Sequence, residues 1–369
     1  MFTSLLLVLA GFAALYQGGN ALLAGASGIA RHFGLPPLLV GLTVVAFATS
    51  APELAVSVLA AFKGNPDIAV GNVLGSNIFN TLVAVGVVVA IAPLTLPRSL
   101  MRWEIPLGFG ATVLVGILAW IGGGIARWEG VLLLALLGVI LTITVRRALR
   151  ANVDADPEAE EGDGAELDAV PAALVMGAGA GAALLDLASI SLVDIAVPGA
   201  AFLTLLNARL HVKRTTLPIR GLAIVFGLAM LVLGSDALVR GATDIALSVG
   251  ISEAVVGLTV VAIGTSAPEL ATAVMAARKG QTDLALGNAL GSNLFNLLAV
   301  LGAAAAIFPI EVAPAFLQRD LPVALGASGL LLLPWLTKGR VARWVGIAML
   351  GGWLAYTSFL VAQALGAFA

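Results

Sequence analysis

Two short motifs rich in oxygen-bearing side chains each occur twice, and they are the residues of this chain best suited to chemistry. The motif TSAPEL at 49–54 returns at 265–270, and GSN-x-FN at 75–80 returns at 291–296. Each motif and its copy are 216 residues apart. The shared offset indicates an internal repeat.

The first motif places a carboxylate beside a break in a helix. Pro52 has no N–H, so the carbonyl of Ala48 loses its helical partner and can face a ligand. Thr49 and Glu53 are four residues apart and share one helix face. The second copy repeats this arrangement with Thr265, Ser266, Pro268 and Glu269.

Both glutamates lie within long apolar runs, where a carboxylate at the centre of a spanning helix costs about 2.5–3.5 kcal/mol. Glu53 and Glu269 are therefore expected to share a cation or to bind protons. The alternative is a protonated glutamate that hydrogen-bonds a neighbouring helix, but this does not explain why the Thr, Ser and Pro around it are duplicated.

The second motif adds neutral oxygens. Ser76 and Asn80 are four residues apart, as are Ser292 and Asn296, so each pair shares a helix face. The glycines alone indicate close helix packing, but beside the paired glutamates these side chains are expected to be ligands. The combined donors are all oxygens, which suits Ca²⁺ or Na⁺ rather than zinc or copper. Two negative charges match one Ca²⁺.

The elements that must position these residues are membrane helices. Of 369 residues, 60% are hydrophobic and 11% are charged, whereas a soluble protein carries about 25% charged residues. This composition excludes a soluble enzyme and a disordered chain, and the net charge of −2 gives no basic surface for nucleic acid. The absence of cysteine excludes disulfides and thiolate sites.

Ten apolar runs are long enough to span a bilayer. They lie at 3–30, 38–62, 68–92, 105–123, 129–146, 218–247, 254–277, 284–308, 321–337 and 342–365.

The ten spans form two groups of five, which predicts inverted repeats. Residues 41–80 and 257–296 are identical at 28 of 40 positions without a gap. Because five is odd, the second copy enters the membrane from the opposite side. Inverted repeats with helices interrupted at mid-membrane are a transporter architecture, with the binding site where the two breaks meet. The predicted fold is an all-α membrane protein with ten transmembrane helices in two inverted five-helix repeats, at 1–149 and 216–369.

The segment at 150–215 separates the repeats. Its stretch 152–168 carries eight acidic residues, which is typical of a solvated linker; a regulatory calcium loop is the alternative, but no EF-hand pattern is present. The apolar stretch 170–206 crosses the membrane twice or not at all.

Fourteen Lys and Arg fall in the predicted inside loops and four in the outside loops. This bias predicts a multi-pass protein of the inner (plasma) membrane, with both termini outside and 150–215 in the cytoplasm.

The TSAPEL and GSN-x-FN motifs resemble the α-repeats of the calcium/cation antiporter superfamily, specifically its prokaryotic sodium/calcium exchanger branch. The resemblance covers both repeats. It implies a membrane antiporter without a cofactor that exchanges Ca²⁺ for Na⁺ by alternating access, with the first and sixth spans sliding as a gate. The ligand set that it implies adds Ser50 and the backbone carbonyls of Ala46 and Ala262 to the residues above. It gives the residues Thr49, Ser50, Glu53, Ser76, Asn80, Thr265, Ser266, Glu269, Ser292 and Asn296 as side-chain or carbonyl ligands.

One feature departs from the family pattern. Sodium-coupled members often carry an aspartate at one of the positions held here by Asn80 and Asn296, so the motifs supply at most two negative charges. A proton-coupled or other cation-coupled calcium antiporter that uses the same site is therefore the alternative function. A cation channel and an intramembrane enzyme are less favoured, because the repeat is symmetric and no catalytic motif is present. The expected partners are Ca²⁺, Na⁺ and lipid, not nucleic acid, and a monomer is expected.

Overall fold

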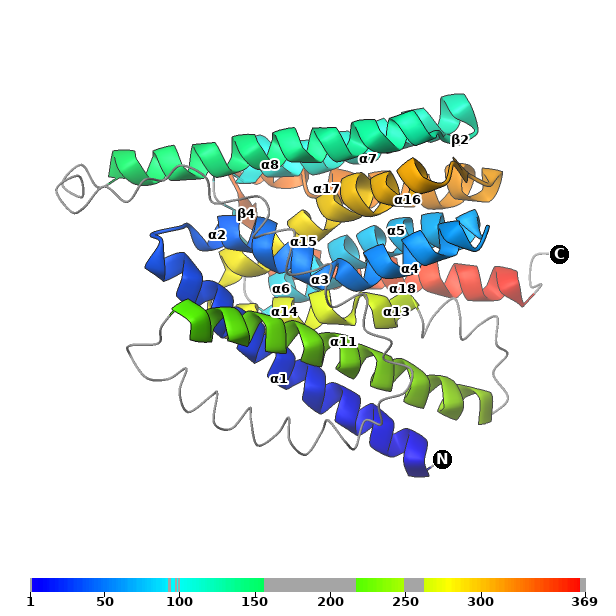
Figure 1. Cartoon of the computed structure of the whole chain (residues 1–369), viewed down its shortest axis with the longest axis horizontal. Helices are drawn as coiled ribbons and strands as arrows, with labels where there is room; N and C mark the ends of the chain where they lie inside the picture. Colours follow the sequence, from blue (N-terminus) through cyan, green and yellow to red (C-terminus); the bar gives the residue numbers. More distant parts are fainter. Residues whose placement is uncertain are drawn as a thin grey trace.

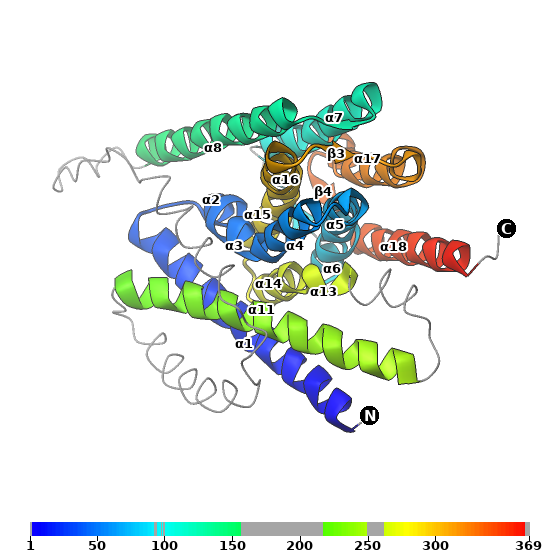
Figure 2. The ribbon, with the colours of Figure 1, turned by 45° about the vertical axis from the view of Figure 1, so that its right-hand side comes forward.

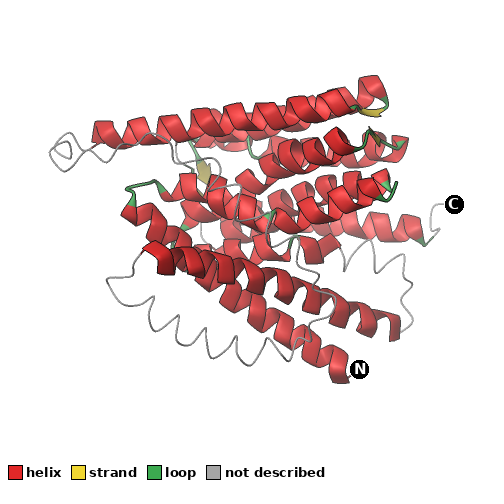
Figure 3. Cartoon of the chain, viewed as in Figure 1, coloured by secondary structure: helices red, strands yellow, loops and turns green. Residues whose placement is uncertain are grey.

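A computed structural model describes residues 2–91, 94–96, 98, 100–155, 217–248 and 262–365. Almost all of these residues are helical (Figure 3), as the sequence predicts. Several helices contain π-helical turns, labelled η. In order, the elements of the first half are α1 (Phe2–His32), α2 (Pro37–Val40), η1 (Gly41–Val45), α3 (Ala46–Thr49), α4 (Ala51–Phe62), α5 (Pro66–Phe79), η2 (Asn80–Val85), α6 (Gly86–Ile91), β1 (Leu94–Thr95), η3 (Leu100–Glu104), α7 (Ile105–Gly122), β2 (Gly124–Ile125) and α8 (Arg127–Ala155).

Over its described residues the second half follows a similar order of elements, with an added 3-10 helix before its last strand. They are α11 (Leu217–Ser248), α13 (Ala262–Thr265), α14 (Ala267–Arg278), α15 (Thr282–Phe295), η7 (Asn296–Val300), α16 (Leu301–Ile307), β3 (Ile310–Glu311), η8 (Phe316–Asp320), α17 (Leu321–Leu330), the 3-10 helix η9 (Leu333–Thr337), β4 (Arg340–Val341) and α18 (Arg343–Ala364).

The 216-residue offset of the motifs extends through both halves. Shifted by 216 residues, the bounds of α4, α5, β1, η3 and β2 coincide with those of α14, α15, β3, η8 and β4. Prolines at the first or second position start α4, α5, α7, α14 and α17, where a missing N–H is tolerated and the backbone is already set for a helix. The duplication therefore covers the element boundaries as well as the motifs.

Helices α1 and α11 show that the two halves are inverted. They run antiparallel and lie side by side (Figures 1 and 2). A Cβ on Gly11 would meet the Gly234 carbonyl at 2.8 Å, and a Cβ on Gly18 would meet the Gly227 carbonyl at 2.8 Å. In the repeat, Gly234 is equivalent to Gly18, and Gly227 is equivalent to Gly11. The contact Gly11–Gly234 is therefore equivalent to the contact Gly227–Gly18, as a twofold axis between the halves requires. The absence of side chains lets the two backbones approach closely, which is how membrane helices associate.

The short strands follow the same symmetry. Strand β1 pairs with β4, and β2 pairs with β3, both antiparallel. Each ladder therefore joins a strand of one half to a strand of the other. The two ladders lie toward opposite ends of the helices (Figure 1).

The described helices form a multi-pass membrane bundle. Eight are long and apolar enough to span a bilayer, and the bent pair Pro37–Thr49 and Ala51–Phe62 gives a ninth among the described residues. The predicted span 254–277 is described only from Ala262 onward, so the predicted count of ten is not settled by this structure. Exposed tryptophans on α7, α8 and α18, including Trp120, Trp128 and Trp344, suit the membrane–water interface.

The repeated motifs lie at the centre of the bundle. Within an 18-residue apolar window of the spans Pro66–Ile91 and Thr282–Ile307, 78% and 72% of the residues are buried, against 11% in Arg343–Gln363 and 22% in Arg127–Arg147. Helices α5 and α15 are therefore the inner pair, and α8 and α18 lie at the periphery (Figure 2).

Candidate cation-binding site

Two helix breaks bring the TSAPEL motifs to the centre of the fold. Between α3 and α4, Ser50 leaves helical geometry with φ −82° and ψ 2°, and Ser266 between α13 and α14 has φ −94° and ψ 7°. The first break bends the span by 44°. The proline two residues later has no N–H and cannot donate to the carbonyl four residues before it, which interrupts the helical hydrogen-bond pattern at each serine. Backbone of this kind at membrane depth is tolerated where it is enclosed by protein or lines a polar cavity.

The break in each half places a glutamate in the first turn of the following helix. Glu53 on α4 and Glu269 on α14 are both completely buried. The two carboxylates are close enough to repel one another. Two anions in a dry environment need a counter-charge, which a bound cation or protons would supply.

Hydroxyl groups from both halves surround Glu53. The hydroxyl oxygens of Ser76 and Ser266 each lie 3.4 Å from its Oε1. They lie 2.9 Å from one another. Its Oε2 has no hydrogen-bond partner among the described residues. The cluster therefore combines Glu53 and Ser76 of the first half with Ser266 of the second.

Glu269 has the matching surroundings with the halves exchanged. The hydroxyl oxygens of Thr49 and Ser292 lie 3.2 Å apart, and both lie next to the Glu269 carboxylate. Neither oxygen of that carboxylate meets the geometry of a hydrogen bond within the described part of the chain. One carboxylate oxygen is thus bonded at Glu53, whereas both oxygens are available at Glu269.

Asn80 and Asn296 occupy a second pair of equivalent positions. Each is fully buried and is the first residue of a π-helical segment, η2 or η7. π-Helical turns are frequent at functional sites. The carboxamide oxygens and nitrogens of both residues, and the hydroxyl of Ser50, find no partner among the described residues. Unpaired buried polar atoms are costly, so these groups fit a role as ligands.

The remaining expected ligands are placed as follows. The Ala46 carbonyl lies at the break but already accepts the Ser50 N–H at 3.0 Å and the Thr49 hydroxyl at 3.3 Å. Thr265 is half-buried at the end of α13. Ala262 begins α13, and the repeated residues 257–261 before it lie outside the described residues.

Two asparagines that the sequence reasoning missed hold the two halves together beside the site. The Asn288 carboxamide oxygen accepts from the Thr49 hydroxyl at 3.2 Å, and its nitrogen donates to Thr272 at 2.8 Å. In the same way, the Asn72 carboxamide oxygen accepts from Thr265 at 3.4 Å. A threonine that gives its proton away keeps lone pairs for a cation. Both asparagines are duplicated 216 residues apart, and that identity could have identified them.

The Asn72 amide nitrogen makes its other contacts within its own half. It donates to the Ser57 hydroxyl at 2.9 Å and to the Glu53 carbonyl at 3.2 Å. In the second half, Thr272 donates to the Glu269 carbonyl at 2.9 Å instead. The supports behind the two carboxylates are therefore similar but not identical.

A third duplicated asparagine pair lies where α5 and α15 cross. The Asn77 amide nitrogen donates to the Asn293 carbonyl at 3.2 Å, and the Asn293 amide nitrogen donates to Thr81 at 2.8 Å. These bonds fix the crossing of the two helices that carry Ser76 and Ser292.

The site is built almost entirely from neutral oxygens. Among the described residues, no three His, Cys, Asp or Glu side chains come together, so the two glutamates carry the formal charge. Hydroxyl, carboxamide and carbonyl oxygens with two carboxylates are ligands for a hard cation.

Comparison with known proteins agrees with this geometry. The family model described as "Sodium/calcium exchanger protein" matches residues 3–146 and 221–362. The chain is 35% identical to the putative antiporter CaxA of Alkalimonas amylolytica, over 93% of each chain. It is 32% identical to the inner membrane protein YrbG of Escherichia coli, over 98% of this chain and 97% of that one.

A solved structure of the sodium-calcium exchanger NCX_Mj is similar in fold. Its TM-score is 0.72 at 25% sequence identity, over 97% of this chain and 99% of that one. This similarity and the family match confirm the expected all-helical exchanger fold and the resemblance carried by the repeated motifs. The family is one of transporters and not of enzymes. The chain belongs to the sodium/calcium exchanger family, within the calcium/cation antiporter superfamily.

Proposed function

We propose that this protein is a secondary active antiporter that exchanges Ca²⁺ for Na⁺ across the membrane by alternating access. The observation that carries the proposal is the pair of fully buried carboxylates, Glu53 and Glu269, presented by two inverted helix breaks and surrounded by hydroxyls of both halves. The description of the family and the name of the exchanger NCX_Mj, which both pair sodium with calcium, support these two ions.

Among the described residues, six buried side-chain oxygens of the proposed ligands have no hydrogen-bond partner, and they suit a calcium ion. They are Glu53 Oε2, both Glu269 oxygens, the Ser50 hydroxyl and the carboxamide oxygens of Asn80 and Asn296. Ca²⁺ takes six to eight oxygen ligands in flexible geometry, and two carboxylates balance its charge. The proposed ligands are the twelve residues named from the sequence, with Asn72 and Asn288 orienting the threonine hydroxyls behind them.

Exchange follows from the charge of the empty site. Without a cation, two carboxylates in a low-dielectric interior repel one another and are costly to enclose. The protein therefore closes over the site only when Ca²⁺ or Na⁺ neutralises it, and this prevents uncoupled leak. The closely packed α1 and α11 are the proposed gate, which slides across the core formed by the other helices.

Asn80 and Asn296 bear on the coupling ion. With both positions neutral, the described site holds two formal negative charges, which one Ca²⁺ or two Na⁺ would balance. The proposed exchange is thus of low sodium stoichiometry.

We further propose that the protein works as a monomer in the inner (plasma) membrane. The name of the relative YrbG supports an inner-membrane location. In the proposed orientation both termini are outside, and residues 150–215 form a cytoplasmic connection between the repeats at 1–149 and 216–369. The start of α1 and the end of α18 lie on the same side of the bundle, which is compatible with this orientation (Figure 1).

The test is ⁴⁵Ca²⁺ uptake by proteoliposomes that contain the purified protein, with Na⁺, K⁺ and H⁺ gradients imposed one at a time. An outward Na⁺ gradient should drive uptake, and K⁺ or H⁺ gradients should not. Uptake driven by a pH gradient without Na⁺ would replace sodium with protons as the coupling ion. Large uncoupled currents in electrical recordings would instead indicate a channel.

A further inference from the structure

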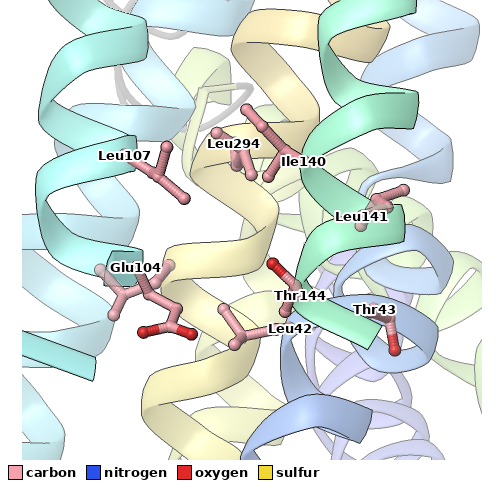
Figure 4. Close-up of a pocket in the computed structure, with 9 residues that line it drawn as sticks. Leu42, Thr43, Glu104, Leu107, Ile140, Leu141, Thr144 and Leu294 are labelled. Atoms are coloured by element: carbon pink, nitrogen blue, oxygen red, sulfur yellow. The ribbon is translucent and has the colours of Figure 1, made fainter. Parts of the chain in front are cut away.

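A third buried acid, Glu104, lies outside the transport site. It ends η3, directly before α7. It lines a pocket whose other walls come from η1, α8 and α15 (Figure 4). The pocket is mainly apolar, with leucines such as Leu42 and Leu290 and the hydroxyl residues Thr43 and Thr144. The Oε2 atom of Glu104 is buried and has no hydrogen-bond partner in the described part of the chain.

The second half shows a different environment for the equivalent acid. Asp320 is the residue 216 positions after Glu104. Arg319 binds both of its carboxylate oxygens at 2.8 Å, and the Tyr356 hydroxyl donates to it at 2.7 Å. At the positions equivalent to Arg319 and Tyr356, the first half carries Trp103 and Ile140. The indole of Trp103 has no charge with which to form an ion pair, and Ile140 has no hydroxyl to donate. The two acids are therefore equivalent in position but differ in charge compensation.

The cation near Glu104 is Arg147, on α8. Its guanidinium lies 3.6 Å from the centroid of the Trp103 ring, and it attracts the Glu104 carboxylate. No ion pair between the two is formed among the described residues. Apart from Glu104 itself, none of the described residues that line the pocket carries a titratable side chain.

The pocket offers too few oxygens for a metal ion. Glu104, Thr43 and Thr144 supply four side-chain oxygens at most, and the Thr43 hydroxyl proton is already donated to the Leu39 carbonyl at 2.8 Å. Ca²⁺ takes six to eight oxygen ligands, whereas a proton needs one carboxylate oxygen. An unpaired carboxylate among leucines is costly, and the neutral acid is not.

We propose that Glu104 is a second cation site of this protein and that its ligand is a proton. In this proposal the protonated acid occupies the apolar pocket, where the structure places the Glu104 side chain, and the ionised form turns toward Arg147. The equivalent acid in the second half, Asp320, is already held by Arg319. The proton site is therefore present on one side of the membrane, which is the cytoplasmic side in the proposed orientation.

This site can act on transport through the walls that it shares with the cation ligands. Leu42 and Thr43 lie on η1, which leads directly into Ala46 and the first break. Leu290 and Leu294 flank Ser292 on α15. Helices η1 and α15 pack tightly, since a Cβ on Gly291 would meet the Leu42 carbonyl at 2.6 Å. Emptying the pocket when Glu104 ionises thus shifts both ligand-bearing segments.

Infrared difference spectroscopy of the purified full chain, between about pH 5 and pH 8, tests proton binding without any transport. The protonated-carboxyl band of the wild type should lose one component in Glu104→Gln and none in Asp320→Asn. Trp103→Arg keeps Glu104 and gives it an arginine at the position equivalent to Arg319, so that an ion pair like the one with Asp320 can form. This variant should lose the same component of the protonated-carboxyl band. Identical difference spectra for the wild type and both Glu104→Gln and Trp103→Arg would overturn the proposal.

The effect on transport rests on the proposed Ca²⁺ exchange, so it is measured separately. In right-side-out and inverted membrane vesicles, the pH of each face is changed in turn while ⁴⁵Ca²⁺ flux is recorded. The two central glutamates lie at equivalent positions of the inverted halves and so favour neither face, whereas Glu104 should add a pH dependence at the cytoplasmic face alone. Glu104→Gln should abolish this difference between the faces and retain flux. An unchanged difference would overturn the regulatory role, and absence of flux in the wild type would count against the proposed function instead.

Discussion

Neutralising one of the two central carboxylates should weaken Ca²⁺ binding far more than any surface charge change. Glu53→Gln and Glu269→Gln keep the size of the side chain but remove one of the two charges that face the ion. Both carboxylates are completely buried, so water cannot replace the lost interaction. Removing one partner of a buried ion pair costs about 3–5 kcal/mol, which corresponds to a loss of affinity between about 150-fold and about 4,000-fold.

The two variants should differ in detail because their surroundings differ. In Glu53→Gln a neutral amide oxygen replaces the charged acceptor of the serine hydroxyls 3.4 Å away, which weakens those bonds. Glu269 has no such bond among the described residues. Glu269→Gln should therefore have the smaller effect on thermal unfolding in the absence of Ca²⁺, while both variants lose Ca²⁺ affinity.

Isothermal titration of the purified protein with Ca²⁺, together with ⁴⁵Ca²⁺ uptake in proteoliposomes, measures both effects. Glu311→Gln is the matched control, because Glu311 is an exposed carboxylate on β3 and should bind and transport like the wild type. If both central variants bound Ca²⁺ within about threefold of the wild type, less than 1 kcal/mol, the charge-balance reasoning would be refuted.

Two further predictions concern the supports of the site. Asn288→Ala removes the side-chain acceptor of the Thr49 hydroxyl, leaving the Ala46 carbonyl as its acceptor. It also leaves the Thr272 hydroxyl without the Asn288 amide. Unpaired buried polar groups cost about 1–3 kcal/mol, so Ca²⁺ affinity should fall roughly 5-fold to 150-fold; an unchanged titration would show that Asn288 is not needed to orient the hydroxyl. Gly18→Val puts side-chain atoms where even a Cβ would lie 2.8 Å from the Gly227 carbonyl, so transport should be lost. The control Gly138→Val lies at a position with no described atom within 4 Å of the added Cβ and should transport normally. Equal rates for the two variants would show that close contact between α1 and α11 is not needed.

The duplicated motifs allowed the centre of the fold to be predicted, because their chemistry is local. Proline lacks an N–H and interrupts a helix whatever its surroundings, so Pro52 and Pro268 predict a helix break beside each glutamate. The structure places both breaks in the interior, with Glu53 and Glu269 buried at them. The inversion of the halves likewise followed from an odd number of spans.

Contacts between the halves could not be predicted in the same way. Thr49 and Asn288 are 239 residues apart, and no periodicity in either segment indicates that their side chains meet. The π-helical turns that begin at Asn80 and Asn296 have no sequence pattern that distinguishes them from α-helix. The contrast between Glu104 and Asp320 is present in the aligned halves, but it depends on neighbours, Trp103 and Arg319, that have diverged.

The most direct test of the central claim is a crystal structure of the protein with bound Ca²⁺, with the ion located by anomalous scattering. The structure described above predicts one strong peak at mid-membrane, with oxygens of both Glu53 and Glu269 at about 2.3–2.6 Å. Carboxylates far apart or turned toward lipid, with no peak between them, would contradict it.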